Sequence, residues 1–171
     1  MFLTRILAAG VCCALFLAPS LVFAADRGPS TPEERKQALE YIQDFESNPQ
    51  GPKATDEREW LLKWIIEIPD IHVNVCMILD NLPKGNKKDA STIFIAETFS
   101  QTAYRLQNPD KRDDRLAEYQ AGVEGALRVY EVLLKSNSKD RQPYLDDLVK
   151  RREAGTLAQF VQERAAATCS K

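Results

Sequence analysis

Hydrophobic residues recur at helical spacing through most of the chain after residue 30. The motif Thr31–Glu34 combines a capping threonine, a proline at the first helical position and a glutamate two residues later, which predicts a helix start. Asn48–Pro49 predicts the end of that helix. Comparable apolar stripes, bounded by proline, glycine or asparagine, predict further helices over residues 51–68, 71–82, 89–107, 109–137, 140–154 and 156–169.

The segment 71–82 fits two patterns. A helical stripe would consist of Ile71, Val75, Leu79 and Leu82, and a strand-like alternation would consist of Val73, Val75 and Met77. No partner strand is evident, and helices are predicted on both sides. We therefore predict a helix here, with Asp70 as its N-cap.

The segment 109–137 has the clearest pattern. Its main apolar face consists of Leu116, Tyr119, Val123, Leu127, Tyr130 and Leu134. A neighbouring face carries Gly122 and Gly125, which would let another helix approach closely. The remaining stripe has Glu→Arg and Glu→Lys pairs four residues apart, as expected of a solvated face.

These patterns predict an all-α fold: a single compact domain over residues 25–171, with six or seven short helices packed as a bundle or as stacked hairpins. The 171 residues are 44% hydrophobic and 28% charged, which is typical of globular proteins. The net charge of −2 is too balanced to indicate a nucleic-acid binder.

Residues 1–24 have the pattern of a secretory signal peptide. Arg5 precedes an apolar run over residues 6–17, Pro19 breaks that run, and Val22–Ala24 offers small residues for cleavage before Ala25. A membrane anchor is less favoured because of Pro19 and the missing stop-transfer charges. We expect an exported protein, periplasmic or secreted, with no membrane span after removal of the signal.

Two of the four cysteines lie in the predicted signal, which leaves Cys76 and Cys169. An exported chain with two cysteines most simply forms one disulfide. A metal site formed by His72 and the two thiolates is the alternative. It is less favoured because export promotes oxidation and no fourth ligand is evident. We therefore expect neither a metal nor a cofactor.

His72 is also the only histidine, and it lies near Glu67 and Asp70 around the break at Pro69. These side chains could carry out general acid–base chemistry if a cleft formed there. The structural interpretation, a helix end followed by a capping aspartate, is favoured. The sequence contains no phosphate-binding loop, nucleophile elbow or paired-cysteine redox motif.

Trp60 and Trp64 lie one helical turn apart and could present a surface to a flat ligand. The same stripe continues through Leu61, Ile65 and Ile68, so packing in the core is the favoured interpretation.

The segment Gln120–Leu127, followed by Cys169, resembles the Gly-rich helix and closing cysteine of small exported immunity proteins that protect bacteria against secreted toxins. The resemblance covers a minor part of the chain, and the additional cysteines of those proteins are absent. It indicates a class of exported, disulfide-bonded helical binding proteins.

The sequence therefore favours a non-enzymatic binding or adaptor domain for a protein or a small molecule, with no nucleic-acid partner. The alternative hypothesis is a hydrolase-like enzyme that uses the carboxylates near Pro69 together with His72. An apolar pocket lined by Trp64 or Tyr130 would favour a ligand or a substrate, whereas an open apolar patch would favour a protein partner.

Overall fold

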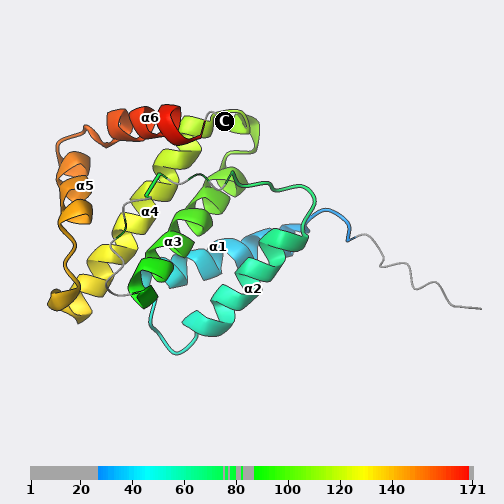
Figure 1. The fold of residues 1–171 in the computed structure, drawn as a ribbon. Helices are drawn as coiled ribbons and strands as arrows, with labels where there is room; N and C mark the ends of the chain where they lie inside the picture. The colour runs from blue at the N-terminus through cyan, green and yellow to red at the C-terminus, as the bar shows by residue number, and fades with distance from the viewer. Residues whose placement is uncertain (1–26, 75, 77, 80–81, 83–86, 170–171) are drawn as a thin grey trace, which may run out of the picture.

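The computed structural model describes residues 27–169 apart from 75, 77, 80–81 and 83–86 (Figure 1). The predicted signal segment, residues 1–24, lies outside the described residues. The described part is all-α and contains no strand. Its helices are α1 (Pro32–Ser47), α2 (Ala54–Glu67), α3 (Lys87–Gln107), α4 (Arg115–Ser136), α5 (Pro143–Glu153) and α6 (Leu157–Thr168). No helix in this part is both long and apolar enough to cross a membrane.

Helices α3 and α4 run antiparallel through the centre of the molecule (Figure 1). Helix α1 packs against α2, α3 and α4, whereas α5 and α6 pack against α4 on the side away from α2. The core lies between these helices, and Phe45 of α1 meets Phe99 of α3 edge-to-face with ring centroids 5.2 Å apart. The prediction of a compact helical fold is confirmed.

The start of α1 forms as its sequence predicts. Thr31 Oγ1 accepts a hydrogen bond from the Glu34 amide at 3.1 Å, and the Glu34 carboxylate accepts one from the Thr31 amide at 2.9 Å. These two bonds satisfy amide groups that a helix start leaves unpaired.

Helix α4 starts later than the predicted residue 109. Pro109 instead begins a single 3₁₀ turn, η1 (Pro109–Lys111), and the Asp114 side chain caps α4 by accepting a hydrogen bond from the Ala117 amide at 3.1 Å. The assignment of Leu116 to the buried face was wrong, because Leu116 lies in the exposed first turn and is 45% exposed.

The ends of the last two helices differ in detail from the prediction. Another 3₁₀ turn, η2 (Ser138–Asp140), precedes α5, which begins only at Pro143. Gly155 ends α5 with φ of +72°, a conformation that glycine adopts without strain. Thr156 does not cap α6 through its side chain, because its hydroxyl donates to the Arg151 carbonyl at 3.3 Å.

The predicted helix over 71–82 was wrong. Its described residues are irregular, and Ile78 N donates to the carbonyl of Cys76, only two residues earlier. The buried residues do not follow one helical stripe: they are Ile71, Cys76, Ile78 and Leu79. The segment is rich in β-branched residues and has only modest helix propensity. Burial of these side chains and the disulfide at Cys76 outweigh that propensity. Val75, which belongs to both patterns, and Met77, which belongs to the strand-like alternation, lie outside the described residues.

The small face of α4 packs against α3, as predicted. A Cβ atom at Gly125 would overlap the Ser100 side chain, and one at Gly122 would lie 2.7 Å from Gln101 Cγ. Real Cβ atoms do not approach other heavy atoms so closely. The two glycines therefore set the distance between the central helices.

The predicted disulfide is present. Cys76 and Cys169 are bonded, with their Cα atoms 5.6 Å apart and a sequence separation of 93. The bond ties the end of α6 to the irregular segment before α3. Helix α6 also buries Leu157, Val161 and Ala165.

We predict that reduction of the disulfide lowers the free energy of unfolding by about 4–5 kcal/mol, the chain-entropy value for closing so long a loop. Helix α6 should lose amide protection first, because it is short, terminal and tethered by this bond. Urea unfolding and hydrogen exchange with and without reductant measure both effects.

The double variant Cys76→Ser/Cys169→Ser is the control, and it should reproduce the reduced protein without any reductant. Two free thiols in the unfolded, unreduced protein, or an unchanged urea midpoint after reduction, would contradict the prediction.

Candidate functional site

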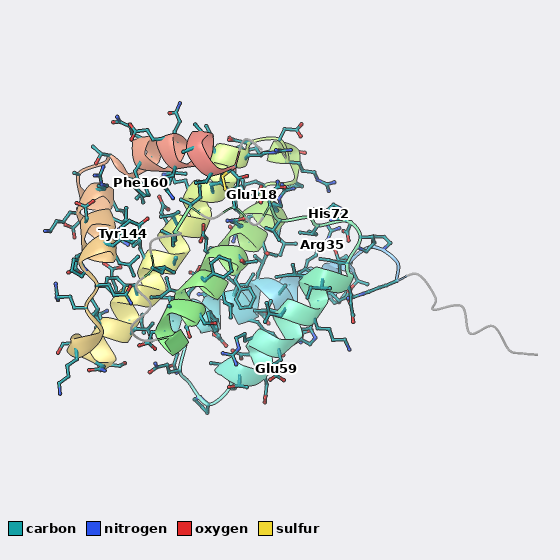
Figure 2. The ribbon with its side chains drawn as sticks, in the orientation of Figure 1. Arg35, Glu59, His72, Glu118, Tyr144 and Phe160 are labelled. Atoms are coloured by element: carbon teal, nitrogen blue, oxygen red, sulfur yellow. A yellow bond between two sulfur atoms is a disulfide. The ribbon has the colours of Figure 1, made fainter. Side chains whose placement is uncertain are left out.

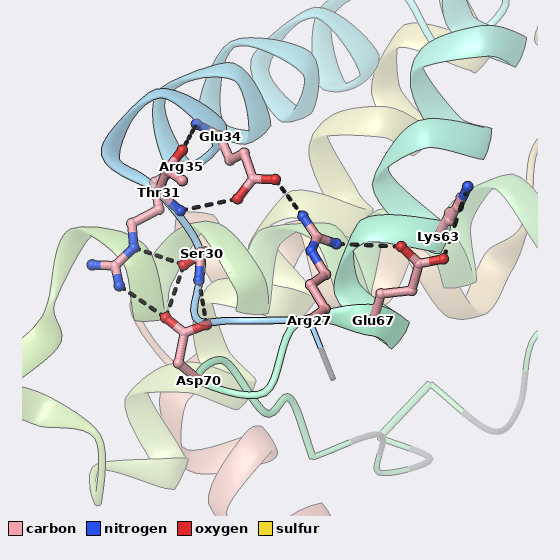
Figure 3. Close-up of polar contacts among 8 residues, drawn as sticks. All are labelled: Arg27, Ser30, Thr31, Glu34, Arg35, Lys63, Glu67 and Asp70. Atoms are coloured by element: carbon pink, nitrogen blue, oxygen red, sulfur yellow. Dashed lines mark hydrogen bonds and ion pairs between the residues drawn. The ribbon is translucent and has the colours of Figure 1, made fainter. Parts of the chain in front are cut away.

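Asp70, one of the three residues of the candidate polar cluster, holds the start of the described chain in place (Figure 3). Its Oδ1 accepts a hydrogen bond from the Ser30 amide, and its Oδ2 accepts bonds from Ser30 Oγ and Arg35 Nη2, all at 2.8 Å. Burial alone would raise the pKa of Asp70, but these hydrogen bonds outweigh it and hold the pKa below its usual value. The predicted role of Asp70 as an N-cap is therefore wrong.

Glu67 belongs to an adjoining ion-pair network at the end of α2 (Figure 3). Its carboxylate lies 3.4 Å from Arg27 Nη1 and 3.9 Å from Lys63 Nζ, and Arg27 also pairs with Glu34. Such partly exposed pairs contribute little stability individually. Together with Asp70 they fasten residues 27–35 to the end of α2, which is a structural role.

His72 does not join the two carboxylates. It is exposed in the segment between α2 and α3 (Figure 2), and no hydrogen bond links it to Glu67 or Asp70 within the described part of the chain. Because Cys76 is bonded to Cys169, the thiolates of the alternative metal site are also consumed. The described residues contain no cluster of three or more histidine, cysteine or acidic side chains arranged to hold a metal ion.

The two tryptophans pack together. Their rings stack with centroids 5.6 Å apart, and Tyr41 meets Trp60 edge-on at 5.3 Å. Trp64 is only 2% exposed. The indoles border a depression of about 180 Å³ whose other walls are the mutually paired Arg27, Glu34, Lys63 and Glu67. Trp64 therefore offers almost no surface to a flat ligand, whereas Trp60 is half-buried.

An apolar groove of about 360 Å³ lies between α2, the following segment and α3. Its lining residues are Leu62, Ile65, Ile66, Ile71, His72, Val73, Phe94, Ile95 and Thr98. Ile66 is 81% exposed, the most exposed large hydrophobic side chain in the described part of the chain. We refer to this surface as the apolar groove.

The helical pattern of α2 could have identified Ile66 as a candidate contact residue. Leu61 and Trp64 belong to the buried stripe of α2, which the buried Ile68 continues just after the helix, and Ile66 lies off that stripe. An isoleucine on the polar face of an amphipathic helix is a candidate contact residue.

A small arginine-lined cavity of about 50 Å³ adjoins the groove. Its lining residues are Arg35, Asp70, Ile71, Arg105, Leu106, Pro109 and Arg112. Ile71 lines both the cavity and the groove, so the two are neighbours. We refer to this space as the arginine cavity.

A fourth depression, of about 280 Å³, lies between α1, α3 and α4 and is lined by both polar and apolar side chains. Arg128 of α4 makes two hydrogen bonds of 2.8 Å to the Glu46 carboxylate of α1 across it. Ser100 of α3 donates to the same carboxylate. These polar groups satisfy one another and connect the three helices. The depression is therefore a weaker candidate site.

No protein-family model, curated protein or solved structure matches the chain. The apolar groove offers exposed apolar side chains. The arginine cavity beside it offers arginine side chains whose charge is not fully paired.

Glu97 is a buried carboxyl that lines none of these depressions. It lies on α3 beside the α4 contact, is 2% exposed, and neither of its oxygens has a hydrogen-bond partner within the described residues. Burial raises the pKa of Glu97 to about 8. The side chain is therefore mostly neutral at pH 7.

We predict that Glu97 makes the protein less stable as the pH rises from about 4.5 to about 8, because the unfolded chain releases this proton at lower pH than the folded chain. The free energy of unfolding should fall by at most about 1.4 kcal/mol per pH unit from this group alone. Urea unfolding across this pH range measures the slope.

Glu97→Gln should remove this component of the slope, whereas Glu163→Gln, at an exposed position on α6, should keep it. Identical slopes for the wild type and Glu97→Gln would show that the carboxyl is ionised in the folded protein.

Proposed function

We propose that this chain is an exported, non-enzymatic binding domain whose apolar groove receives an apolar segment of a partner protein. The observation that carries the proposal is the exposure of Ile66 on the rim of a groove whose other walls are mostly aliphatic and aromatic. An exposed isoleucine beside such a groove costs solvation free energy, which burial against a partner would recover.

The open shape of the groove favours a protein segment over a small ligand. Trp64 and Tyr130, which the sequence offered as walls of an enclosed pocket, are 2% and 1% exposed and belong to the core. The groove instead lies at the surface between α2 and α3. Apolar grooves between helices commonly receive an amphipathic segment that inserts a few regularly spaced side chains.

Export is supported by two independent features. Residues 1–24 have the pattern of a signal peptide, and the Cys76–Cys169 bond is of a kind that persists in oxidising compartments. The hydrolase alternative has less support, because Glu67 and Asp70 are engaged by basic side chains and His72 lines the apolar groove.

Selection of short random peptides on the oxidised protein tests the proposal. We expect enriched sequences with apolar residues at helical spacing, and Ile66→Glu should weaken their binding by about tenfold or more, since burial of one isoleucine contributes about 1.5–3 kcal/mol. Fluorescence anisotropy with labelled peptides measures the dissociation constants.

Leu116→Glu is the matched control, because it places the same charge at another exposed hydrophobic position that does not line the groove. Its binding should match that of the wild type, and both variants should retain the wild-type circular dichroism spectrum. The proposal fails if no peptide is enriched, or if the enriched peptides bind the wild type and Ile66→Glu equally.

A further inference from the structure

The arginine cavity brings together three guanidinium groups from separate parts of the chain. Arg35 comes from α1, Arg105 from α3, and Arg112 from the residues after η1. Two carboxylates accompany them: Asp70 lines the cavity, and Glu118 of α4 pairs with Arg105 at 2.7 Å. The three arginines and the two carboxylates together therefore carry a net charge of +1.

Three of the four oxygens of these carboxylates are engaged, and Glu118 Oε1 is buried without a hydrogen-bond partner among the described residues. Both oxygens of Asp70 accept hydrogen bonds from Ser30 or Arg35, and Glu118 Oε2 accepts the bond from Arg105 Nη2. These carboxylates therefore pair with Arg35 and with Nη2 of Arg105.

The other two arginines, Arg105 and Arg112, have hydrogen-bond donors without a partner among the described residues. The Arg105 side chain is 14% exposed, and its Nε is buried without a hydrogen-bond partner among the described residues. Arg112 is exposed and makes no ion pair or hydrogen bond within the same part of the chain. A buried donor left unpaired costs free energy, so an acceptor at this position would be stabilising.

We propose that the arginine cavity binds a carboxylate. One excess positive charge matches a monoanion better than a dianion, and a space of about 50 Å³ suits a group of a few atoms. The planar fork of a guanidinium matches the two oxygens of a carboxylate. Arg105 and Arg112 supply the contacts, while Arg35 and Asp70 form the far wall.

The shared wall at Ile71 indicates where the carboxylate comes from. An apolar segment in the groove would carry its flanking residues towards the cavity, so the ligand is an acidic side chain next to the apolar residues of the partner. This assignment of the source rests on the function proposed above, whereas the carboxylate site itself does not.

Acetate is the probe for the site alone. The Nε–H signal of Arg105 in ¹H–¹⁵N spectra should shift saturably as acetate replaces chloride at constant ionic strength. Arg112→Gln should weaken acetate binding by about tenfold, since it removes a charged donor. Arg115→Gln, which removes a nearby exposed arginine outside the cavity, should leave it unchanged.

Absence of a shift with acetate, an equal shift in Arg112→Gln, or tighter binding of sulfate than of acetate would overturn the carboxylate site. The peptides selected on the groove then test the source. Exchange of their acidic residue for the amide should weaken binding to the wild type and have a smaller effect on binding to Arg112→Gln.

The two proposals can fail separately. Peptides that depend on Ile66 but do not distinguish acid from amide would overturn the assignment of the source and leave the groove function standing. Acetate binding without any selected peptide would overturn the groove function and support the carboxylate site.

Discussion

The close approach of α3 and α4 is the constraint on which the other features depend. Gly122 and Gly125 leave no room for a side chain between these helices, so Gln101 and Ser100 of α3 pack directly against the α4 backbone. This contact fixes the rotation of α3 about its axis. The opposite side of α3 then presents Ile95 to the apolar groove, and its last turn carries Arg105 to the arginine cavity.

The other wall of the site is irregular chain held by tethers. The segment after α2 is fastened at one end by the bonds of Asp70 to Ser30 and Arg35, and further along by the Cys76–Cys169 disulfide. Between these points Ile71 separates the groove from the cavity. Without regular backbone hydrogen bonding, the shape of this segment depends on the side-chain contacts and on the covalent bond.

The sequence was sufficient where the determinants of structure are local. The capping motif Thr31–Glu34 and the stop at Gly155 formed as expected, because each depends on a few neighbouring residues. The glycine face of α4 was visible in the periodicity of one helix, although the sequence did not identify α3 as its partner. The segment 71–82 was mispredicted because burial and the disulfide, both long-range, decide its path. The arginine cavity could not be predicted, since Arg35 is distant in sequence from Arg105 and Arg112, and the packing of α1 against α3 brings it to them.

A double-mutant cycle at the α3–α4 contact tests whether Gly125 and Ser100 determine how closely the two helices approach. Gly125→Ala should strongly destabilise the wild-type protein, because the new methyl group overlaps Ser100, and it should cost much less in a Ser100→Gly background. We expect a coupling free energy of about 1 kcal/mol or more from urea unfolding of the wild type, the two single variants and the double variant. Additive effects of the two substitutions would show that these residues do not meet and would contradict the account.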